Sequence, residues 1–168
     1  MIMGRPYKAA ACIVCQDVDG KFLLTRRERN MGSYPKAWVF PGGHIEIDEG
    51  LDEGGLRELY EETGVKVNVT RTPGTNQAIY SYGGHDVTVT PFYAFEATRK
   101  YDESDPQQPR PPHASHFVLF LKVRLPVKST EVHLNLDPKE VEASAWVSEE
   151  QAKIILAKPS SQANEEIE

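Results

Sequence analysis

The run from Gly43 to Val65, GHIEIDEGLDEGGLRELYEETGV, constrains this chain more than any other part of it. Wound at about 100° per residue, residues 51–63 predict a helix with a core-facing side and a polar side. The polar side carries the carboxylates Glu58, Glu61 and Glu62. Like charges three and four residues apart destabilise a helix unless a cation lies over them. Carboxylate oxygens suit Mg²⁺ or Mn²⁺, so the run predicts a cation-binding helix face.

The opposite side of this helix is predicted to pack into the core, through Leu56, Leu59, Tyr60 and Thr63. Gly54 and Gly55 are unusual inside a helix, because each glycine costs roughly 1 kcal/mol relative to alanine. We expect both to project on the acidic side. Our hypothesis is that the missing side chains admit a metal, a phosphate or a neighbouring loop.

Length and charge indicate one globular domain over residues 1–158, followed by a polar tail, 159–168, that we expect to be disordered. The chain has 168 residues, is 39% hydrophobic and has a net charge of −6. Apart from Arg26, Arg27 and Arg29 its basic residues are scattered, which makes duplex nucleic acid an unlikely partner and favours a small phosphorylated substrate.

The apolar stretch near the N-terminus, residues 9–15, is too short for a membrane span and lacks a cleavage-site pattern. We therefore expect a soluble intracellular protein, in the cytoplasm, with no membrane partner. The sequence leaves open whether it is a monomer or a homodimer. Cys12 and Cys15 point to opposite faces of a predicted strand, so we interpret them as buried thiols rather than as a redox or metal pair.

Strands and helices alternate in the order expected of an α+β domain. A hairpin turn at residues 17–20 and a short apolar strand before Pro41 precede the acidic helix. Ser148 and Gln151 predict the start of a last helix. A proline-rich loop without periodicity is predicted at 100–115. The predicted strands cover residues 9–16, 22–26, 37–40, 65–69, 77–82, 87–98, 117–125 and 142–147, and the helices 51–63 and 149–157.

The acidic run also matches a known pattern: Gly, five residues, Glu, seven residues, then Arg-Glu-apolar-x-Glu-Glu-x-Gly-apolar. It resembles the Nudix box at every specified position. The segments LLTRRERN, WVFPGGHIEIDEGLDEGGLRELYEETGV and HASHFVLFL together resemble one animal subgroup of that family more closely than the box alone does. The resemblance covers roughly Lys8 to Ala157. It implies an α/β/α sandwich, with a mixed sheet between helices and the box as a loop-helix-loop.

The resemblance also implies roles for the box residues. Glu61 and Glu62 would be the best metal ligands, with Glu58 a ligand or a general base. Arg57 would pair with and orient a carboxylate, and Gly43 would offer its carbonyl oxygen to the metal. Glu49 is expected to orient or cap rather than to bind metal. The implied cofactor is Mg²⁺ or Mn²⁺.

Outside the box, the resemblance favours a further carboxylate shortly before a late tryptophan, as base or metal ligand. Glu140, six residues before Trp146, fits that place, with Glu142 as the competitor and an exposed turn acid as the ordinary alternative for either. Glu46 is a candidate near the metal or substrate.

Three further side chains are candidates for substrate contact. Arg27 is the first choice for substrate phosphates, although arginines commonly end strands at the surface. His116, and beside it His113, are candidates for substrate contact or ordinary histidines. Trp38 either stacks a base or supports the core, and its place in an apolar strand favours the core.

Together these features imply a hydrolase that cleaves the diphosphate linkage of a nucleoside diphosphate derivative with metal-activated water. Coenzyme A diphosphatase and RNA cap hydrolase are the alternatives, although residues 29–39 do not match the extra motif of the former. An alternative of another class is a nucleotide-binding sensor without catalysis. Such sensors often lack the box acids that this chain retains.

Overall fold

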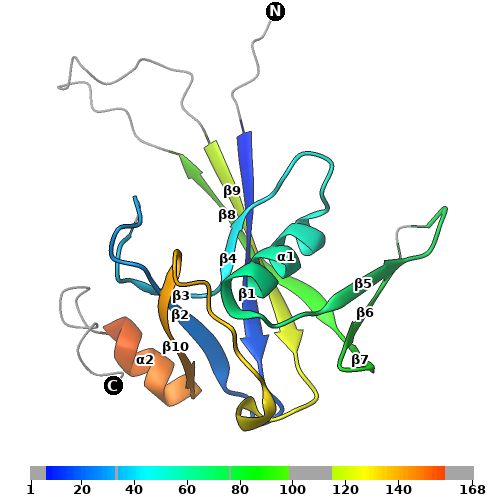
Figure 1. Ribbon diagram of the computed structural model, residues 1–168. Coiled ribbons are helices and arrows are strands. Elements are labelled where there is room, and N and C mark those ends of the chain that lie inside the picture. Colours follow the sequence, from blue (N-terminus) through cyan, green and yellow to red (C-terminus); the bar gives the residue numbers. More distant parts are fainter. Residues whose placement is uncertain (1–6, 33, 76, 99–114, 158–168) are drawn as a thin grey trace, which may run out of the picture.

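The computed structural model describes residues 7–32, 34–75, 77–98 and 115–157. Its main sheet has the strand order β10-β2-β1-β9-β8, with β3 paired to β2 and β4 paired to β1. The strands of this sheet are β1 (Tyr7–Gln16), β2 (Phe22–Arg27), β3 (Trp38–Val39), β4 (Gly42–His44), β8 (Val89–Thr98), β9 (Ser115–Arg124) and β10 (Val141–Val147). Helix α1 (Leu51–Thr63) crosses in front of the sheet, and helix α2 (Glu149–Ala157) lies beside β10 (Figure 1).

A second, antiparallel sheet extends to one side of α1 and contains β5 (Asn68–Arg71), β6 (Ala78–Tyr82) and β7 (His85–Val87) (Figure 1). In the main sheet β1 runs parallel to β9 over its whole length and antiparallel to β2 and β4. A mixed sheet with two helices is the architecture that the sequence predicted.

The core forms between α1 and the main sheet, because every second side chain of β1 points toward α1. Ala11, Ile13 and Cys15 are fully buried and belong to the cluster that contains Leu56 and Leu59 of α1. Their neighbours Cys12 and Val14 point to the other face of the sheet. Full burial of each large aliphatic side chain contributes roughly 1.5–3 kcal/mol, so this interface is what holds α1 in place.

Both ends of α1 are capped. The Gly50 amide donates to the Glu53 carboxylate at 3.0 Å. Gly64 adopts the left-handed conformation, with φ of 76°, and its amide donates to the Tyr60 carbonyl at 2.8 Å. Glycine is favoured at such a position because it has no Cβ.

The small sheet is tied to the first turn of α1 by side chains. Arg71 of β5 bonds to Asp52 and to Glu53, each at 2.7 Å, and the Tyr80 hydroxyl of β6 donates to Asp52 at 2.6 Å. The hydrogen bond from Tyr80 and the charge of Arg71 outweigh the effect of burial and lower the pKa of Asp52. The start of the acidic helix is therefore held by a charged network as well as by the core.

Several expectations were wrong in detail. Tyr60 was expected in the core but is 49% exposed. Gly55 was expected on the acidic side but faces the sheet, where a Cβ would lie 2.8 Å from Ile13 Cδ1. The strands β4 and β7 and the 3-10 turn at Ser129–Glu131 were not predicted, and β5 begins at Asn68 rather than at Val65.

Other expectations on local structure are confirmed. The hairpin turn at residues 17–20 and the Ser148–Gln151 cap are both present. Cys15 is buried and Cys12 half-buried, both as free thiols. Burial and the charge of Glu62 raise the pKa of Cys12 to about 11.

His113, most of the proline-rich loop and the polar tail lie outside the described residues. Within the parts of the chain that the structure describes, no helix is long and apolar enough to cross a membrane.

Candidate active site

Arg57 is the centre of the acidic cluster on α1. Its Nε and Nη2 donate to the two oxygens of Glu49, at 2.8 and 3.1 Å. Its Nη1 donates to Glu58 and to Glu61, both at 2.9 Å, and Nη2 also reaches the His44 carbonyl at 3.0 Å. The planar guanidinium thus fixes three carboxylates and the end of β4 relative to one another.

Two glycines allow close packing around β4, Gly43 against α1 and Gly42 against β1. A Cβ on Gly43 would lie 2.5 Å from the Glu58 carboxyl carbon, and a Cβ on Gly42 would lie 2.2 Å from the Ala11 carbonyl oxygen. Gly42 also has φ of 156°, which favours glycine. The Gly42 amide donates to Glu62 at 3.3 Å. A side chain at residue 43 would displace the Glu58 carboxylate, whereas one at residue 42 would push β4 away from β1.

Ionisation of Glu62 is unfavourable in the metal-free protein. Its side chain is only 5% exposed. Burial, reinforced by the charges of Glu58 and Glu140, raises the pKa of Glu62 to about 8, although the Gly42 amide and Arg27 oppose the shift. Burial also raises the pKa of Glu58 despite its bonds to Arg57. Without a cation Glu62 therefore keeps its proton at neutral pH, and a bound cation would favour its ionised form.

Glu140 and Arg27 reach this cluster from the other side of the site. Arg27 ends β2 opposite Val141 of β10, and the Glu28 amide donates to the Glu140 carbonyl at 2.8 Å. The charge of Glu140 acts on both Glu58 and Glu62, and the charge of Arg27 acts on Glu62. Both candidates from outside the box are thus placed at the acidic cluster.

Glu142, the competitor of Glu140, is engaged elsewhere. One of its oxygens lies 2.7 Å from Nε of Arg26. The guanidinium of Arg26 lies 5.7 Å from the ring centre of Trp38. Trp38 is thus half-buried next to a charged pair and not part of the acidic cluster.

The remaining candidates lie at the rim. Glu61 is paired with Arg57 but is 54% exposed. Glu46 is exposed in the loop before α1, and its amide donates to Glu49 at 3.0 Å. His116 of β9 faces His44 of β4, with ring centres 5.7 Å apart. His44 directly follows Gly43, so this histidine pair borders the site.

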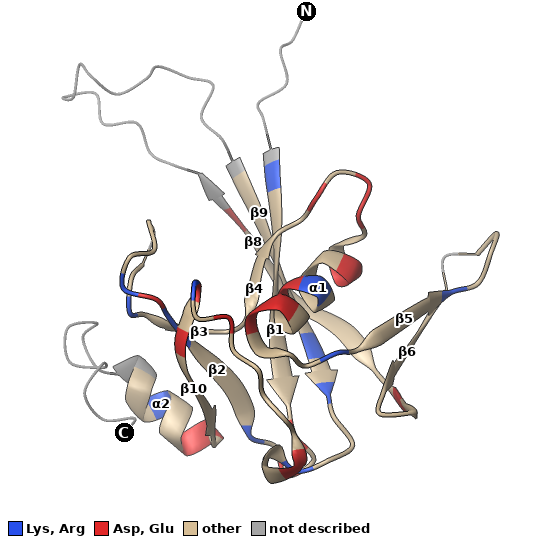
Figure 2. Ribbon diagram, viewed as in Figure 1, with Lys and Arg blue, Asp and Glu red and all other residues tan. Residues whose placement is uncertain are grey.

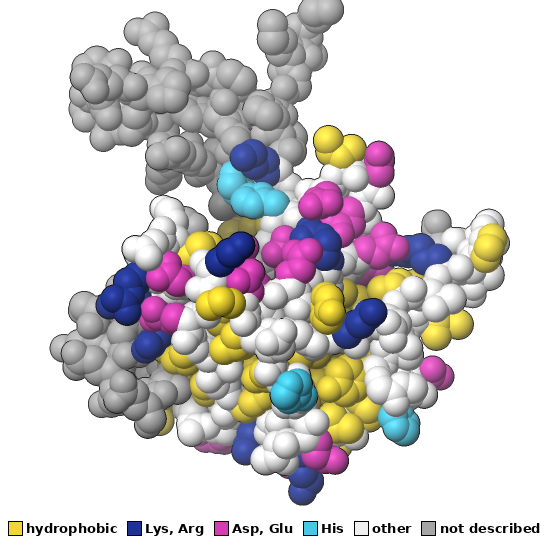
Figure 3. Space-filling view, in the orientation of Figure 1, with side chains coloured by type: hydrophobic (Ala, Val, Ile, Leu, Met, Phe, Trp, Pro, Cys, Tyr) yellow, Lys and Arg dark blue, Asp and Glu magenta, His cyan; other side chains and the backbone are white. Residues whose placement is uncertain are grey.

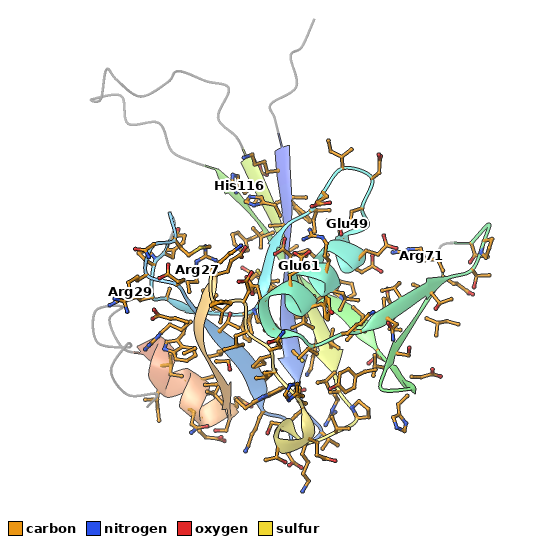
Figure 4. All side chains as sticks on the ribbon, in the orientation of Figure 1. Arg27, Arg29, Glu49, Glu61, Arg71 and His116 are labelled. Carbon is orange, nitrogen blue, oxygen red and sulfur yellow. The ribbon has the colours of Figure 1, made fainter. Side chains whose placement is uncertain are left out.

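The acids gather on and around α1 (Figure 2). In the space-filling view they form one patch over the helix and the loop before it, with basic and histidine side chains at its border (Figure 3). Among the labelled side chains, Glu61 lies on α1 and Glu49 in the loop just before it, Arg71 lies on the side of the small sheet, and Arg27 on the side of β2 and β10 (Figure 4). Arg29 points outward beyond Arg27 (Figure 4).

The candidate ligands are the carboxylates of the acidic cluster and the backbone carbonyl of Gly43. Oxygen ligands of this kind suit a hard divalent cation. They are not assembled as a closed ligand cage. Among the described residues no group of three or more His, Cys, Asp or Glu side chains is arranged to hold a metal ion. Glu61 in particular is turned onto Arg57.

Sequence reasoning missed two features. The first is His44 at the border of the site, which the sequence indicates only weakly, through its position next to Gly43. The network of Arg71, Tyr80 and Asp52 joins residues up to 28 positions apart, and no local pattern indicates it.

Comparison with known proteins identifies the family. The model of the NUDIX domain matches residues 6–167. This chain belongs to the Nudix family. The m7GpppN-mRNA hydrolase NUDT17 of Xenopus laevis is 32% identical to this Nudix chain over 158 residues, and that of Danio rerio 28% over 165 residues. These alignments cover 93% and 92% of the chain but 46% of each relative, so the Nudix chain spans less than half of their length.

Among solved structures, the MutT protein of Methanosarcina mazei Go1 superposes with a TM-score of 0.57 at 20% identity. That match covers 94% of this Nudix chain and 86% of the other. It supports the fold that the sequence predicted.

Proposed function

We propose that this Nudix domain is a hydrolase that depends on a divalent cation, Mg²⁺ or Mn²⁺, and cleaves the diphosphate linkage of a nucleoside diphosphate derivative. The observation that carries the proposal is the burial of Glu62 among other carboxylates, with its pKa raised to about 8. A folded protein retains such an unfavourable arrangement where a ligand compensates it.

The candidate ligands are Glu58, Glu61, Glu62 and the Gly43 carbonyl. A divalent cation held there supplies charge neutralisation for the phosphate oxygens and lowers the pKa of bound water. Arg57 supports the site by hydrogen bonds to Glu49, Glu58 and Glu61.

Two residues are proposed to act on the substrate and the water. Glu140 is proposed to accept a proton from the attacking water, supported by its exposure and by the effect of its charge on both Glu58 and Glu62. Arg27 is the proposed partner for a substrate phosphate, because its positive charge acts on the same carboxylate. Glu46 and His116 are proposed substrate contacts at the rim.

The test is phosphate or nucleotide release from a panel of nucleoside diphosphate derivatives, including coenzyme A, with Mg²⁺, with Mn²⁺ and with a chelator. We expect turnover that the chelator abolishes. Glu62→Gln should lower kcat by at least 100-fold with the fold intact by circular dichroism. Reaction in ¹⁸O-labelled water would identify the phosphorus that is attacked. Tight binding of one nucleotide without turnover of any would contradict the proposal and indicate a sensor.

A second candidate is hydrolysis of the 5′ cap of RNA, because the relatives from Xenopus laevis and Danio rerio carry that activity in their names. Capped RNA should then be cleaved at least as efficiently as the free cap dinucleotide. A preference for free nucleotides would favour the first candidate.

A further inference from the structure

A short basic segment, residues 26–36, lies beside the acidic cluster in a chain that is acidic as a whole. It contains four basic side chains and one acidic side chain, although the net charge of the chain is −6. The segment includes the end of β2 and most of its connection to β3. Basic residues mark this part of the ribbon, whereas acidic residues gather on and around α1 (Figure 2). The two surfaces are therefore neighbours of opposite charge.

The one acid of the basic segment, Glu28, is turned back onto its own loop. Its carboxylate accepts hydrogen bonds from the backbone amide of Asn30 at 2.5 Å and from the side-chain amide of Asn30 at 3.1 Å. The carboxylate is thus engaged locally, while the neighbouring Arg29 is exposed to solvent.

The exposed cations of the segment lie next to Arg27. The Arg27 amide donates to the Ala37 carbonyl at 3.0 Å, and the Lys36 amide donates to the Arg27 carbonyl at 3.1 Å. Lys36 is exposed and therefore lies opposite Arg27, at roughly the 5 Å spacing of paired strands. Arg29 points outward beyond Arg27 (Figure 4). The positive charges thus lead outward from Arg27.

The same segment presents an aromatic ring to solvent. Tyr34 is 80% exposed, so its ring contributes little to the core. The Ala37 amide donates to the Tyr34 carbonyl at 3.2 Å, which closes the turn before β3. An exposed ring between cations is the combination that binds single-stranded nucleic acid, because bases stack on the ring and phosphates pair with the charges.

One turn connects the basic segment to α1. The Glu28 amide donates to the Glu140 carbonyl at 2.8 Å, and the Asp137 amide donates to the Glu62 carbonyl at 3.2 Å. In the same region the charge of Arg27 acts on Glu62. The basic segment is therefore held against the acidic cluster. A ligand at that cluster has a positive surface at its side.

We propose that the basic segment binds single-stranded RNA that continues from a substrate held at the acidic cluster. Arg29 and Lys36 contact backbone phosphates, and Tyr34 stacks on a base. The proposal rests on the second candidate function, in which the reacting group is the 5′ cap of an RNA. Phosphate contacts and stacking are largely independent of sequence, so the surface accepts RNA of any sequence. Because the acids of α1 repel the RNA backbone, the basic segment also sets the direction in which the RNA leaves the site.

The kinetic experiment compares the free cap dinucleotide with a capped RNA of about 20 nucleotides, both with Mg²⁺. The measured quantity is the ratio of the two kcat/KM values, RNA over dinucleotide. It should fall at least about threefold in Arg29→Gln, in Lys36→Gln and in Tyr34→Ala, because only the RNA reaches the basic segment.

Arg124→Gln is the matched control for these variants. Arg124 is also an exposed arginine, but it ends β9 at the opposite end of that strand from His116, which borders the site. Its ratio of kcat/KM values should stay within about twofold of the wild-type ratio.

Binding is read separately from catalysis, by fluorescence anisotropy of labelled oligouridine in the presence of a chelator. Arg29→Gln and Lys36→Gln should each raise the Kd and lower the slope of log Kd against log salt concentration by about 0.7, the value for one phosphate contact of a single strand. Tyr34→Ala should raise the Kd about fivefold or more with an unchanged slope. Tyr34→Trp should restore the affinity.

Equal falls in kcat/KM for both substrates, or the same loss of the ratio in Arg124→Gln, would overturn the proposal. So would wild-type binding of oligouridine that none of the three variants weakens, or tighter binding of duplex RNA than of a single strand of the same length. Absence of cap hydrolysis, with the effects of the variants on oligouridine binding intact, would contradict the second candidate function but not the RNA-binding surface.

Discussion

Arg57 holds Glu49 through two parallel hydrogen bonds, Nε to Oε1 at 2.8 Å and Nη2 to Oε2 at 3.1 Å. Lysine offers no such fork, so Arg57→Lys should release Glu49 and let Glu61 and Glu58 move apart. We expect kcat to fall roughly 100-fold and the free energy of unfolding to fall by about 1–2 kcal/mol. Steady-state kinetics and urea unfolding would measure both.

Arg71 provides the matched control for this change. It also bonds to two carboxylates, Asp52 and Glu53, but outside the acidic cluster. Arg71→Lys should lower stability by less than about 1 kcal/mol, because Arg71 is exposed, and should change kcat less than threefold. Equal losses of kcat in both variants would mean that Arg57 acts only through the stability of α1.

Glu62 gives the metal-free protein a pH dependence of stability. Its pKa is raised from 4.5 to about 8 in the folded state, so between these values the folded protein holds a proton that the unfolded chain has lost. The free energy of unfolding should therefore fall as the pH rises from about 4.5 to about 8. Glu62→Gln removes this contribution, and at pH 8 with a chelator the variant should be more stable than the wild type by roughly 2 kcal/mol.

The control for this prediction is Glu61→Gln, whose side chain is more than half exposed. It should retain the slope between pH 4.5 and pH 8. Addition of Mg²⁺ at pH 8 should raise the Tm of the wild type more than that of Glu62→Gln. If the free energy of unfolding of Glu62→Gln falls with pH as steeply as that of the wild type, the pH dependence comes from other groups.

The glycines inside α1 are required by close packing. A Cβ at residue 55 would lie 2.8 Å from Ile13 Cδ1 and 3.0 Å from Ala11 Cβ, both fully buried. The gain in helix propensity is about 1 kcal/mol, while overpacking a core costs typically about 1–3 kcal/mol. Gly55→Ala should therefore lower the Tm, and Ile13→Val should partly restore it. A higher Tm in Gly55→Ala would show that the glycine is only tolerated.

Gly54 has a different neighbour. A Cβ there would lie 2.7 Å from Glu49 Oε2 and 2.5 Å from Ile45 Cδ1. Gly54→Ala should displace Glu49 from Arg57 and lower kcat roughly tenfold or more, with a smaller effect on the Tm than Gly55→Ala. Unchanged kinetics would show that the loop before α1 adjusts.

Glu140 and Glu142 make a matched pair two residues apart. The charge of Glu140 acts on Glu58 and Glu62, whereas Glu142 is paired with Arg26. Glu140→Gln should lower kcat by about 10²–10⁴-fold if it is the base, with little change in stability. Glu142→Gln should change kcat little. The reverse order of effects would transfer the role to Glu142.

The acidic helix was predictable from sequence because its signals are local. The spacing of Leu56 and Leu59, the cap at Gly50 and the left-handed Gly64 each depend on neighbours within four residues. The same holds for the Ser148–Gln151 cap of α2.

What escaped prediction depends on the tertiary structure. Strand β4 is Gly-Gly-His, without strand propensity, and forms only because its backbone pairs with β1. The orientation of Gly55 and the exposure of Tyr60 depend on how α1 is rotated against the sheet. His44 meets His116 through two strand pairings. The roles assigned to Glu58, Glu61, Glu62 and the other candidate residues stay predictions.

The partnership of β1 has a kinetic consequence. It pairs along its whole length with β9. The turn that follows β1 is also held by a distant residue, because the Asp17 carboxylate accepts a hydrogen bond from the amide of Ser129, 112 residues later. A ribosome therefore exposes the first strand long before the strand that covers it has been made. Pairings this distant in sequence slow folding. The Ala-Cys-Ile-Val-Cys segment is thus the part of the nascent chain most in need of protection from aggregation.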